Sequence, residues 1–98
     1  MSFLDNIFKR GPKTDFTSLL SNGAILLDVR TKEEYRAGHV ENSINIPVDD
    51  LSYDLSILVK DIPIITVCAS GMRSSRATNI LANRGYEVYN GGSWTNFK

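Results

Sequence analysis

The sequence predicts a single α/β domain built on a parallel sheet, and three observations lead to this fold class. Four short, mostly apolar runs, at 24–29, 43–46, 62–67 and 86–89, are typical of strands covered on both faces. Segments with helical features separate these runs, and strands that alternate with helices indicate parallel pairing. The length of 98 residues matches one small domain.

The first twelve residues are expected to form a short amphipathic arm ahead of a domain over residues 13–98. Apolar residues recur there at helical spacing before Gly11-Pro12 ends the turn: Phe3, Leu4, Ile7 and Phe8. We expect the arm to dock on its own domain. Contact with a membrane surface or with a partner's groove remains the alternative.

Local start and stop signals define the next elements. Thr14 or Asp15 would cap a helix that Asn22-Gly23 ends, before the strand at 24–29. Thr31 to Glu34 is a capping box that opens a short helix, which Gly38 closes. The strand at 43–46 ends at Pro47, and a helix is expected over about 50–58.

The last third of the chain carries a strand, a loop, a helix and a final strand. After the strand at 62–67, the loop from Cys68 to Met72 leads to a helix over 73–83, which Gly85 stops. The last strand is expected at 86–89, followed by Gly91-Gly92.

Composition and charge exclude several classes of function. The 11 basic and 11 acidic side chains cancel, which argues against nucleic acid or a membrane surface as a partner. No apolar stretch approaches the roughly 20 residues that a transmembrane helix needs. The start has no basic segment followed by an apolar core, so we expect no signal peptide, and the single cysteine excludes an internal disulfide. We expect a cytoplasmic monomer that works without a metal or cofactor.

The charges are distributed unevenly along the chain. No Asp or Glu occurs from Ile62 to Tyr86, where Arg73, Arg76 and Arg84 all lie. This arrangement favours either a local positive site for a small anion or ion pairs with acids elsewhere in the chain, and the pattern leaves both open. No acid near Arg73 in the sequence is available to pair with it.

The main chemical candidate is Cys68. Its strand would deliver it to the carboxyl edge of the sheet, where α/β folds place their ligand sites. The small residues that follow would let the loop turn its backbone N–H groups toward the sulfur, and both those groups and the following helix N-terminus favour an anion. Such a site would lower the thiol pKa and hold a persulfide, Cys–S–S⁻, with help from Arg73 and nearby serines. The alternative is a buried cysteine that acts only as a small apolar residue.

Six segments in order resemble the motif set of the rhodanese family. They are Asp28-Val29-Arg30, Glu34-Tyr35, Gly38-His39-Val40, Ser43 to Pro47, Val67 to Ser74, and Gly85-Tyr86 with Tyr89 to Trp94. The resemblance implies a five-stranded parallel sheet flanked by helices on both faces. It also implies transfer of sulfane sulfur from thiosulfate or another donor, through a Cys68 persulfide, to cyanide, a small thiol or a protein. The substrate- and persulfide-binding loop would then consist of Ala69, Ser70, Gly71, Met72, Arg73 and Ser74.

Other motif residues are candidates for support of the site. Asp28 and Arg30 would line it or, as we favour, fix the turn after their strand, with Arg30 paired to Asp28 and Glu34. His39 is expected to bond backbone rather than to shuttle protons, and Trp94 to pack beside the loop. Ala69 stands where many rhodaneses carry Arg or Lys, so the positive charge of the loop falls mainly on Arg73.

Two rival functions remain open. Cys-dependent phosphatases and arsenate reductases use a similar amide cradle, but with five residues between Cys and Arg, and only four separate Cys68 from Arg73. A non-catalytic regulatory module of the same fold would typically lack the cysteine. Neither alternative is favoured.

Overall fold

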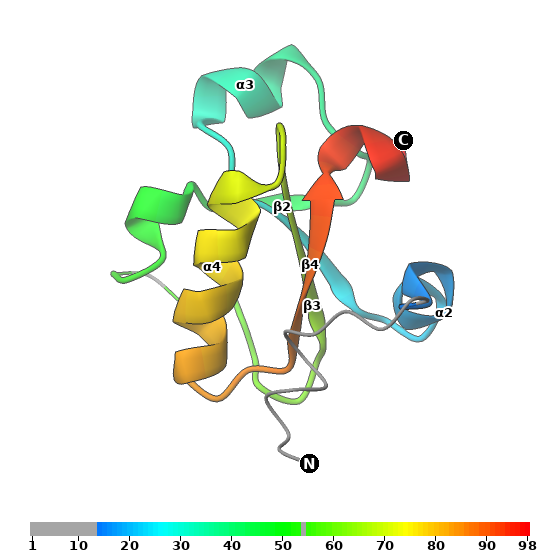
Figure 1. Cartoon of the computed structure of the whole chain (residues 1–98), viewed down its shortest axis with the longest axis vertical. Coiled ribbons are helices and arrows are strands. Elements are labelled where there is room, and N and C mark those ends of the chain that lie inside the picture. Colours follow the sequence, from blue (N-terminus) through cyan, green and yellow to red (C-terminus); the bar gives the residue numbers. More distant parts are fainter. Residues whose placement is uncertain (1–13, 54) are drawn as a thin grey trace.

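The computed structural model describes residues 14–53 and 55–98, which form a sheet with helices on both sides (Figure 1). The strands are β1 (Ile25–Asp28), β2 (Ile44–Asn45), β3 (Ile64–Cys68) and β4 (Val88–Ser93). They pair in the order β2-β1-β3-β4, and every pair is parallel. The predicted α/β class and the parallel pairing are therefore confirmed.

The resemblance implied five strands, and the described residues contain four. These four correspond to the apolar runs of the sequence. Helix α2 (Phe16–Ser21) begins directly after its cap, Asp15, so the described chain has no extended segment ahead of β1 that would supply another strand. The predicted arm at residues 1–12 lies outside the described residues.

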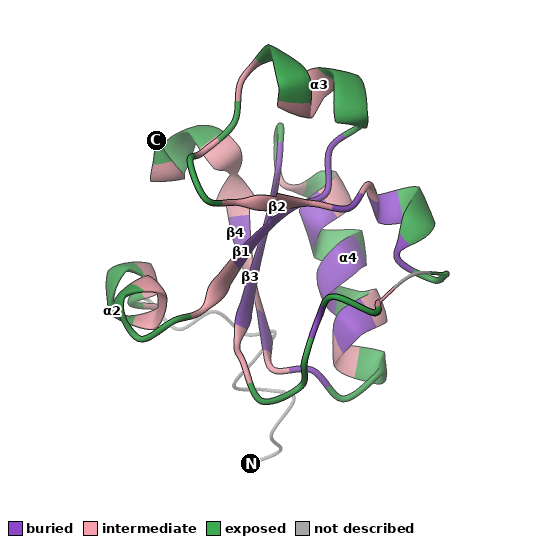
Figure 2. Cartoon of the chain, turned by 180° about the vertical axis from the view of Figure 1, so that it is seen from behind, coloured by how far each residue is buried: buried purple, intermediate pink, exposed green. Residues whose placement is uncertain are grey.

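The two faces of the sheet carry separate apolar clusters. Helix α4 (Met72–Asn83) packs Ala77 and Leu81 against one face, where Leu27 and Ile64 are fully buried. On the other face, Ile65 belongs to a cluster that includes side chains of α2 and of the 3-10 turn η2 (Trp94–Phe97). Figure 2 shows the strands buried between these layers. Helices on both faces thus agree with the prediction.

The predicted caps are present. Asp15 accepts a hydrogen bond from the Ser18 amide at the start of α2. At α3 (Lys32–Ala37), the Thr31 hydroxyl accepts from the Glu34 amide, and the Glu34 carboxylate accepts from the Thr31 amide at 2.9 Å. This capping box fixes the residue at which α3 begins.

The helix expected over 50–58 is wrong. A 3-10 turn, η1 (Val48–Asp50), is followed by further turns. Leu51 and Leu58 are buried, but Ile57 and Val59 are about half exposed, so the segment has no continuous apolar face. Six of the nine residues from 50 to 58 are Asp, Ser, Tyr or Ile, which are weaker helix formers than Ala or Leu.

The last strand begins and ends later than predicted. The Tyr86 amide donates to the Leu81 carbonyl, so Tyr86 still belongs to the closing turn of α4. Beyond Tyr89, the strand continues through two glycines to Ser93, with an irregularity opposite Thr66 and Val67.

In the part of the chain that the structure describes, no helix is long and apolar enough to cross a bilayer.

Candidate active site

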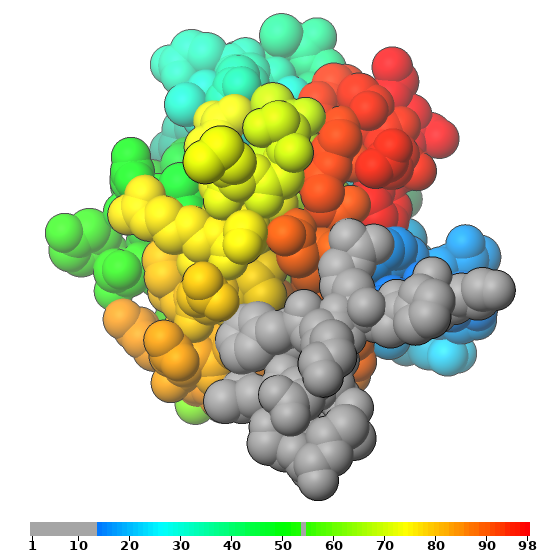
Figure 3. All heavy atoms as spheres, viewed as in Figure 1, coloured from blue at the N-terminus to red at the C-terminus, as the bar shows by residue number. Residues whose placement is uncertain are grey.

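The site is the carboxyl edge of the sheet, where β3 ends at Cys68 beside Ser93 of β4. Figure 3 shows α3, the loop after β3 and the C-terminal segment meeting at this end of the molecule. Cys68 itself is buried, with 1% of its surface exposed, whereas Ala69, Ser70 and Met72 are exposed. The loop therefore lies between the sulfur and solvent.

The loop turns its backbone toward the sulfur. The Gly71 amide donates to Cys68 Sγ at 2.9 Å. Gly71 has φ +107°, a left-handed conformation that favours glycine, and it immediately precedes the first residue of α4. One amide of the loop, that of Gly71, therefore points at the sulfur from the residue that precedes α4.

These contacts change the acidity of the thiol. Burial raises the pKa of Cys68, but the hydrogen bond between the sulfur and the Ser74 hydroxyl and those from the amides of Ser74, Gly71 and Ser70 outweigh burial and lower the pKa below its ordinary value. A lowered pKa increases the fraction of thiolate, which is the nucleophilic form.

Ser74 links the sulfur to a residue that the sequence analysis did not select. Its hydroxyl lies 3.5 Å from Cys68 Sγ and 2.7 Å from the Oδ1 atom of Asn90. Asn90 Oδ1 also accepts from the Gly92 amide at 3.0 Å, so the carbonyl end of this side chain faces the serine. In the sequence, Asn90 stood within the motif segment from Tyr89 to Trp94, and no local signal pointed to a polar contact with the loop.

Arg73 has a partner that the sequence prediction missed. Its two terminal nitrogens donate to the Glu34 carboxylate at 2.7 and 3.0 Å, across 39 positions of the chain. No acid near Arg73 in the sequence pairs with it, but this distant one does, so the charge of the loop is not free as the sequence analysis had favoured. The hydrogen bonds from Arg73, then those from Thr31, lower the pKa of Glu34 to about 2, and Glu34 in turn raises the pKa of Arg73.

Arg30 and Asp28 form a buried ion pair beside this site. Arg30 donates to both oxygens of Asp28 at 2.7 to 3.0 Å, and Asp28 is fully buried. The predicted pairing of Arg30 with the Glu34 carboxylate is wrong, because Arg30 contacts only the Glu34 backbone carbonyl, at 3.4 Å. A further bond to the Gly38 carbonyl at 2.8 Å ties the turn after β1 to the end of α3.

Trp94 and His39 take mainly packing and backbone roles. The Arg30 guanidinium lies 4.3 Å from the Trp94 ring centroid, and Trp94 packs against the α2 face of the sheet. His39 Nδ1 lies 2.7 Å from the Tyr35 carbonyl, and its ring stacks on that of Tyr35.

Arg76 lies in the acid-free stretch from Ile62 to Tyr86 and forms an ion pair with an acid outside it. It pairs with Asp49 at 3.2 Å, as Arg73 pairs with Glu34. For these two arginines, the interpretation that favours ion pairs with distant acids agrees with the structure.

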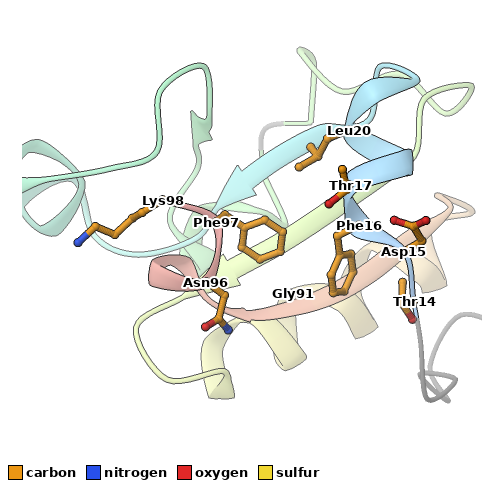
Figure 4. Close-up of a pocket in the computed structure, with 9 residues that line it drawn as sticks. All are labelled: Thr14, Asp15, Phe16, Thr17, Leu20, Gly91, Asn96, Phe97 and Lys98. Atoms are coloured by element: carbon orange, nitrogen blue, oxygen red, sulfur yellow. The ribbon is translucent and has the colours of Figure 1, made fainter.

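A separate pocket of about 510 Å³ lies between α2 and the C-terminal turn (Figure 4). Phe16, Gly91 and Phe97 are among the residues that line it, with the two rings 5.4 Å apart. None of its lining residues belongs to the loop after Cys68.

Comparison with known proteins gives a consistent family match. The model of the rhodanese-like domain matches residues 13–98. The mitochondrial protein HIGH ARSENIC CONTENT 1 of Arabidopsis thaliana is 41% identical over 80 residues, which cover 69% of this chain and 47% of that protein. The thiosulfate sulfurtransferase GlpE of Pseudomonas savastanoi is 29% identical over 83 residues, which cover 84% of this chain and 78% of that one.

A solved structure agrees with these matches. The human single-domain sulfurtransferase TSTD1 superimposes with a TM-score of 0.76 at 27% identity, covering 89% of this chain and 95% of that one. The chain spans about half of the Arabidopsis protein and between 13% and 22% of several larger relatives.

Proposed function

We propose, since the chain belongs to the rhodanese-like domain family, that it is a sulfurtransferase that carries sulfane sulfur as a persulfide on Cys68. Relatives named as sulfurtransferases support this activity at the level of the family. The observation that carries the proposal is the Gly71 amide directed at Cys68 Sγ from 2.9 Å, in a site that lowers the pKa of the thiol. A sulfur anion is the species that this arrangement stabilises best.

The proposed reaction has two steps. The Cys68 thiolate attacks the outer sulfur of the donor, an S–S bond forms, and the old bond breaks with its electron pair on the leaving group. With thiosulfate the leaving group is sulfite, and Cys68 keeps the persulfide. In the second step a thiolate or cyanide attacks the outer sulfur, and Cys68 leaves as the thiolate.

The loop residues would hold the outer sulfur between these steps. Amides of Ser70, Gly71 and Ser74 lie on the cysteine side of the loop and contribute to the lowered pKa of Cys68. We further propose that the protein acts as a cytoplasmic monomer, with a small sulfur donor and a thiol or protein acceptor, without nucleic acid, a metal or a cofactor.

The rival chemistry is transfer or reduction of a tetrahedral oxyanion. Four residues separate Cys68 from Arg73, one fewer than a phosphatase cradle has, and the smaller ring suits a single sulfur better than a phosphoryl group. The name of the Arabidopsis relative mentions arsenic, so arsenate is included among the test substrates.

Intact-mass spectrometry after incubation with a sulfane donor tests the proposal. The native protein should gain one sulfur atom, about 32 Da, and a reducing thiol should remove it. Cys68→Ser should gain none, and the native protein should neither hydrolyse aryl phosphates nor reduce arsenate. Equal uptake by Cys68→Ser, or no uptake by the native protein from any sulfane donor, would show that the persulfide mechanism is wrong.

A further inference from the structure

Arg73 is the one charged side chain between Cys68 and Ser75, so it is the only cation within the loop itself. Both terminal nitrogens of its guanidinium bond the Glu34 carboxylate. Such a two-point pair fixes the orientation of the guanidinium as well as its charge. The positive charge of Arg73 is therefore already paired with the carboxylate of Glu34.

Glu34 is held in place from its own side as well. Its Oε1 atom accepts from the Thr31 amide at 2.9 Å and lies 3.1 Å from the Thr31 hydroxyl. With its pKa lowered to about 2, the carboxylate stays charged at any pH at which the thiol reacts. Release of Arg73 toward a substrate would leave this fixed carboxylate without its cation.

The buried ion pair of Arg30 and Asp28 beside the loop has no net charge. Arg30 is bound to Asp28 with both side chains almost fully buried. With the Arg73–Glu34 pair also neutral, the thiolate of Cys68 is left as one net negative charge in this group. A dianion such as thiosulfate would approach against that charge, with backbone amides, the Ser74 hydroxyl and the helix N-terminus in its favour but no unpaired cation of the loop.

We propose that Glu34 is a specificity-determining residue that disfavours dianionic donors and selects organic persulfides, R–S–SH, whose reacting group carries at most one negative charge. This inference rests on the proposed function and names its substrate class. The Arg73 and Glu34 side chains are 35% and 36% exposed, so a donor that reaches the loop also reaches the pair. In the step that it selects, Cys68–S⁻ attacks the outer sulfur of R–S–SH. Cys68–S–SH forms, and R–S⁻ leaves with the electron pair of the broken S–S bond.

Glu34→Gln tests the proposal, with Glu33→Gln as the matched control. Glutamine keeps an oxygen that accepts from the Thr31 amide, so the capping box survives while the charge is lost. Glu33 is an exposed acid of the same first turn, so its replacement removes the same charge one residue away. Labelling of Cys68 is followed by mass with two donors, thiosulfate and the persulfide of 2-mercaptoethanol.

The native protein should be labelled faster by the mercaptoethanol persulfide than by thiosulfate. Glu34→Gln should raise the rate of labelling by thiosulfate by about tenfold or more. Tenfold corresponds to the weakest hydrogen bonds to charged groups, the kind of bond that the substitution would free. The rate of labelling by the persulfide should change much less. Glu33→Gln should leave the ratio of the two rates unchanged. An unchanged or lower thiosulfate rate in Glu34→Gln would overturn the proposal.

Salt provides a second test on the native protein, independent of how the variant folds. Repulsion between like charges is screened by salt, so thiosulfate labelling should become faster as ionic strength rises, and labelling by the persulfide should respond less. A thiosulfate rate that falls with salt would show that the loop presents a free cation, against the proposal. If neither donor labels Cys68 in any protein, the proposed sulfurtransferase function itself fails, and the inference fails with it.

Discussion

Replacing Arg30 with alanine is expected to destabilise the fold far more than it affects any chemistry. Asp28 is 0% exposed and Arg30 is 4% exposed, so the variant would leave a carboxylate buried without its cation. Removal of one partner of a buried ion pair typically costs about 3 to 5 kcal/mol. The side chain also donates to the Gly38 carbonyl and lies over Trp94, so these contacts would be lost as well.

Urea unfolding followed by far-UV circular dichroism measures this effect. Tryptophan fluorescence is less suitable because Arg30 lies 4.3 Å from the Trp94 ring, and the substitution would change the signal of the folded state. With a slope of about 1 to 3 kcal/mol per molar urea, the midpoint should fall by about 1 M or more. Arg36→Ala, which changes an exposed arginine of α3, should stay within about 0.5 kcal/mol of the native protein.

Arg30→Lys separates charge from geometry. Lysine keeps the positive charge but cannot reproduce the bonds that the guanidinium makes to both oxygens of Asp28, so an intermediate loss of stability is expected. A loss below about 1 kcal/mol for Arg30→Ala would refute the reasoning, because that is the range for an exposed pair. So would a fully stable Arg30→Ala protein that fails to form the persulfide.

Three further outcomes follow from the site and its surroundings. Ser74→Ala should raise the thiol pKa by removing the hydrogen bond between the Ser74 hydroxyl and the sulfur, and the pH profile of iodoacetamide alkylation at Cys68 should shift upward; an unchanged midpoint would contradict this. Gly91→Ala would place a Cβ 2.8 Å from the Ile65 side chain and 3.0 Å from the Phe97 ring, so chemical denaturation should show a loss of about 1 to 3 kcal/mol. Because the folded-state pKa of Glu34 is lowered from 4.5 to about 2, its contribution to stability is present above pH 4.5 and is lost as the pH falls toward 2. Acid titration of Glu34→Gln should therefore lose less stability over this interval than the native protein does.

The sequence predicted best those features that depend on neighbouring residues. The capping box of α3 requires only that Thr31 and Glu34 stand three residues apart, and the structure contains it. Burial of the strands followed from their apolar runs in the same way. The prediction of a helix over 50–58 was wrong. Leu51 and Leu58 are both buried, and their spacing fits one face of a helix as well as it fits two buried residues joined by turns.

Contacts between distant segments were not predictable from these patterns. Ser74 and Asn90 meet because β4 pairs with β3 in one register, in which Asn90 stands opposite Thr66, the last pair before the irregularity. Shifting a strand by one residue would turn its side chains to the other face, so the contact follows from the register rather than from the residue types.

The pairing of Glu34 with Arg73 depends both on a local capping signal and on a contact between distant segments. The capping box decides the residue at which α3 begins, and this local choice sets where the carboxylate stands relative to the loop. Oε1 of Glu34 bonds both the Thr31 amide and Arg73, so the same atom caps α3 and holds the cation of the loop. A start of α3 displaced by one residue would turn the carboxylate by about 100° around the helix, away from Arg73. A local capping signal thereby sets which carboxylate pairs with Arg73, 39 positions further along the chain.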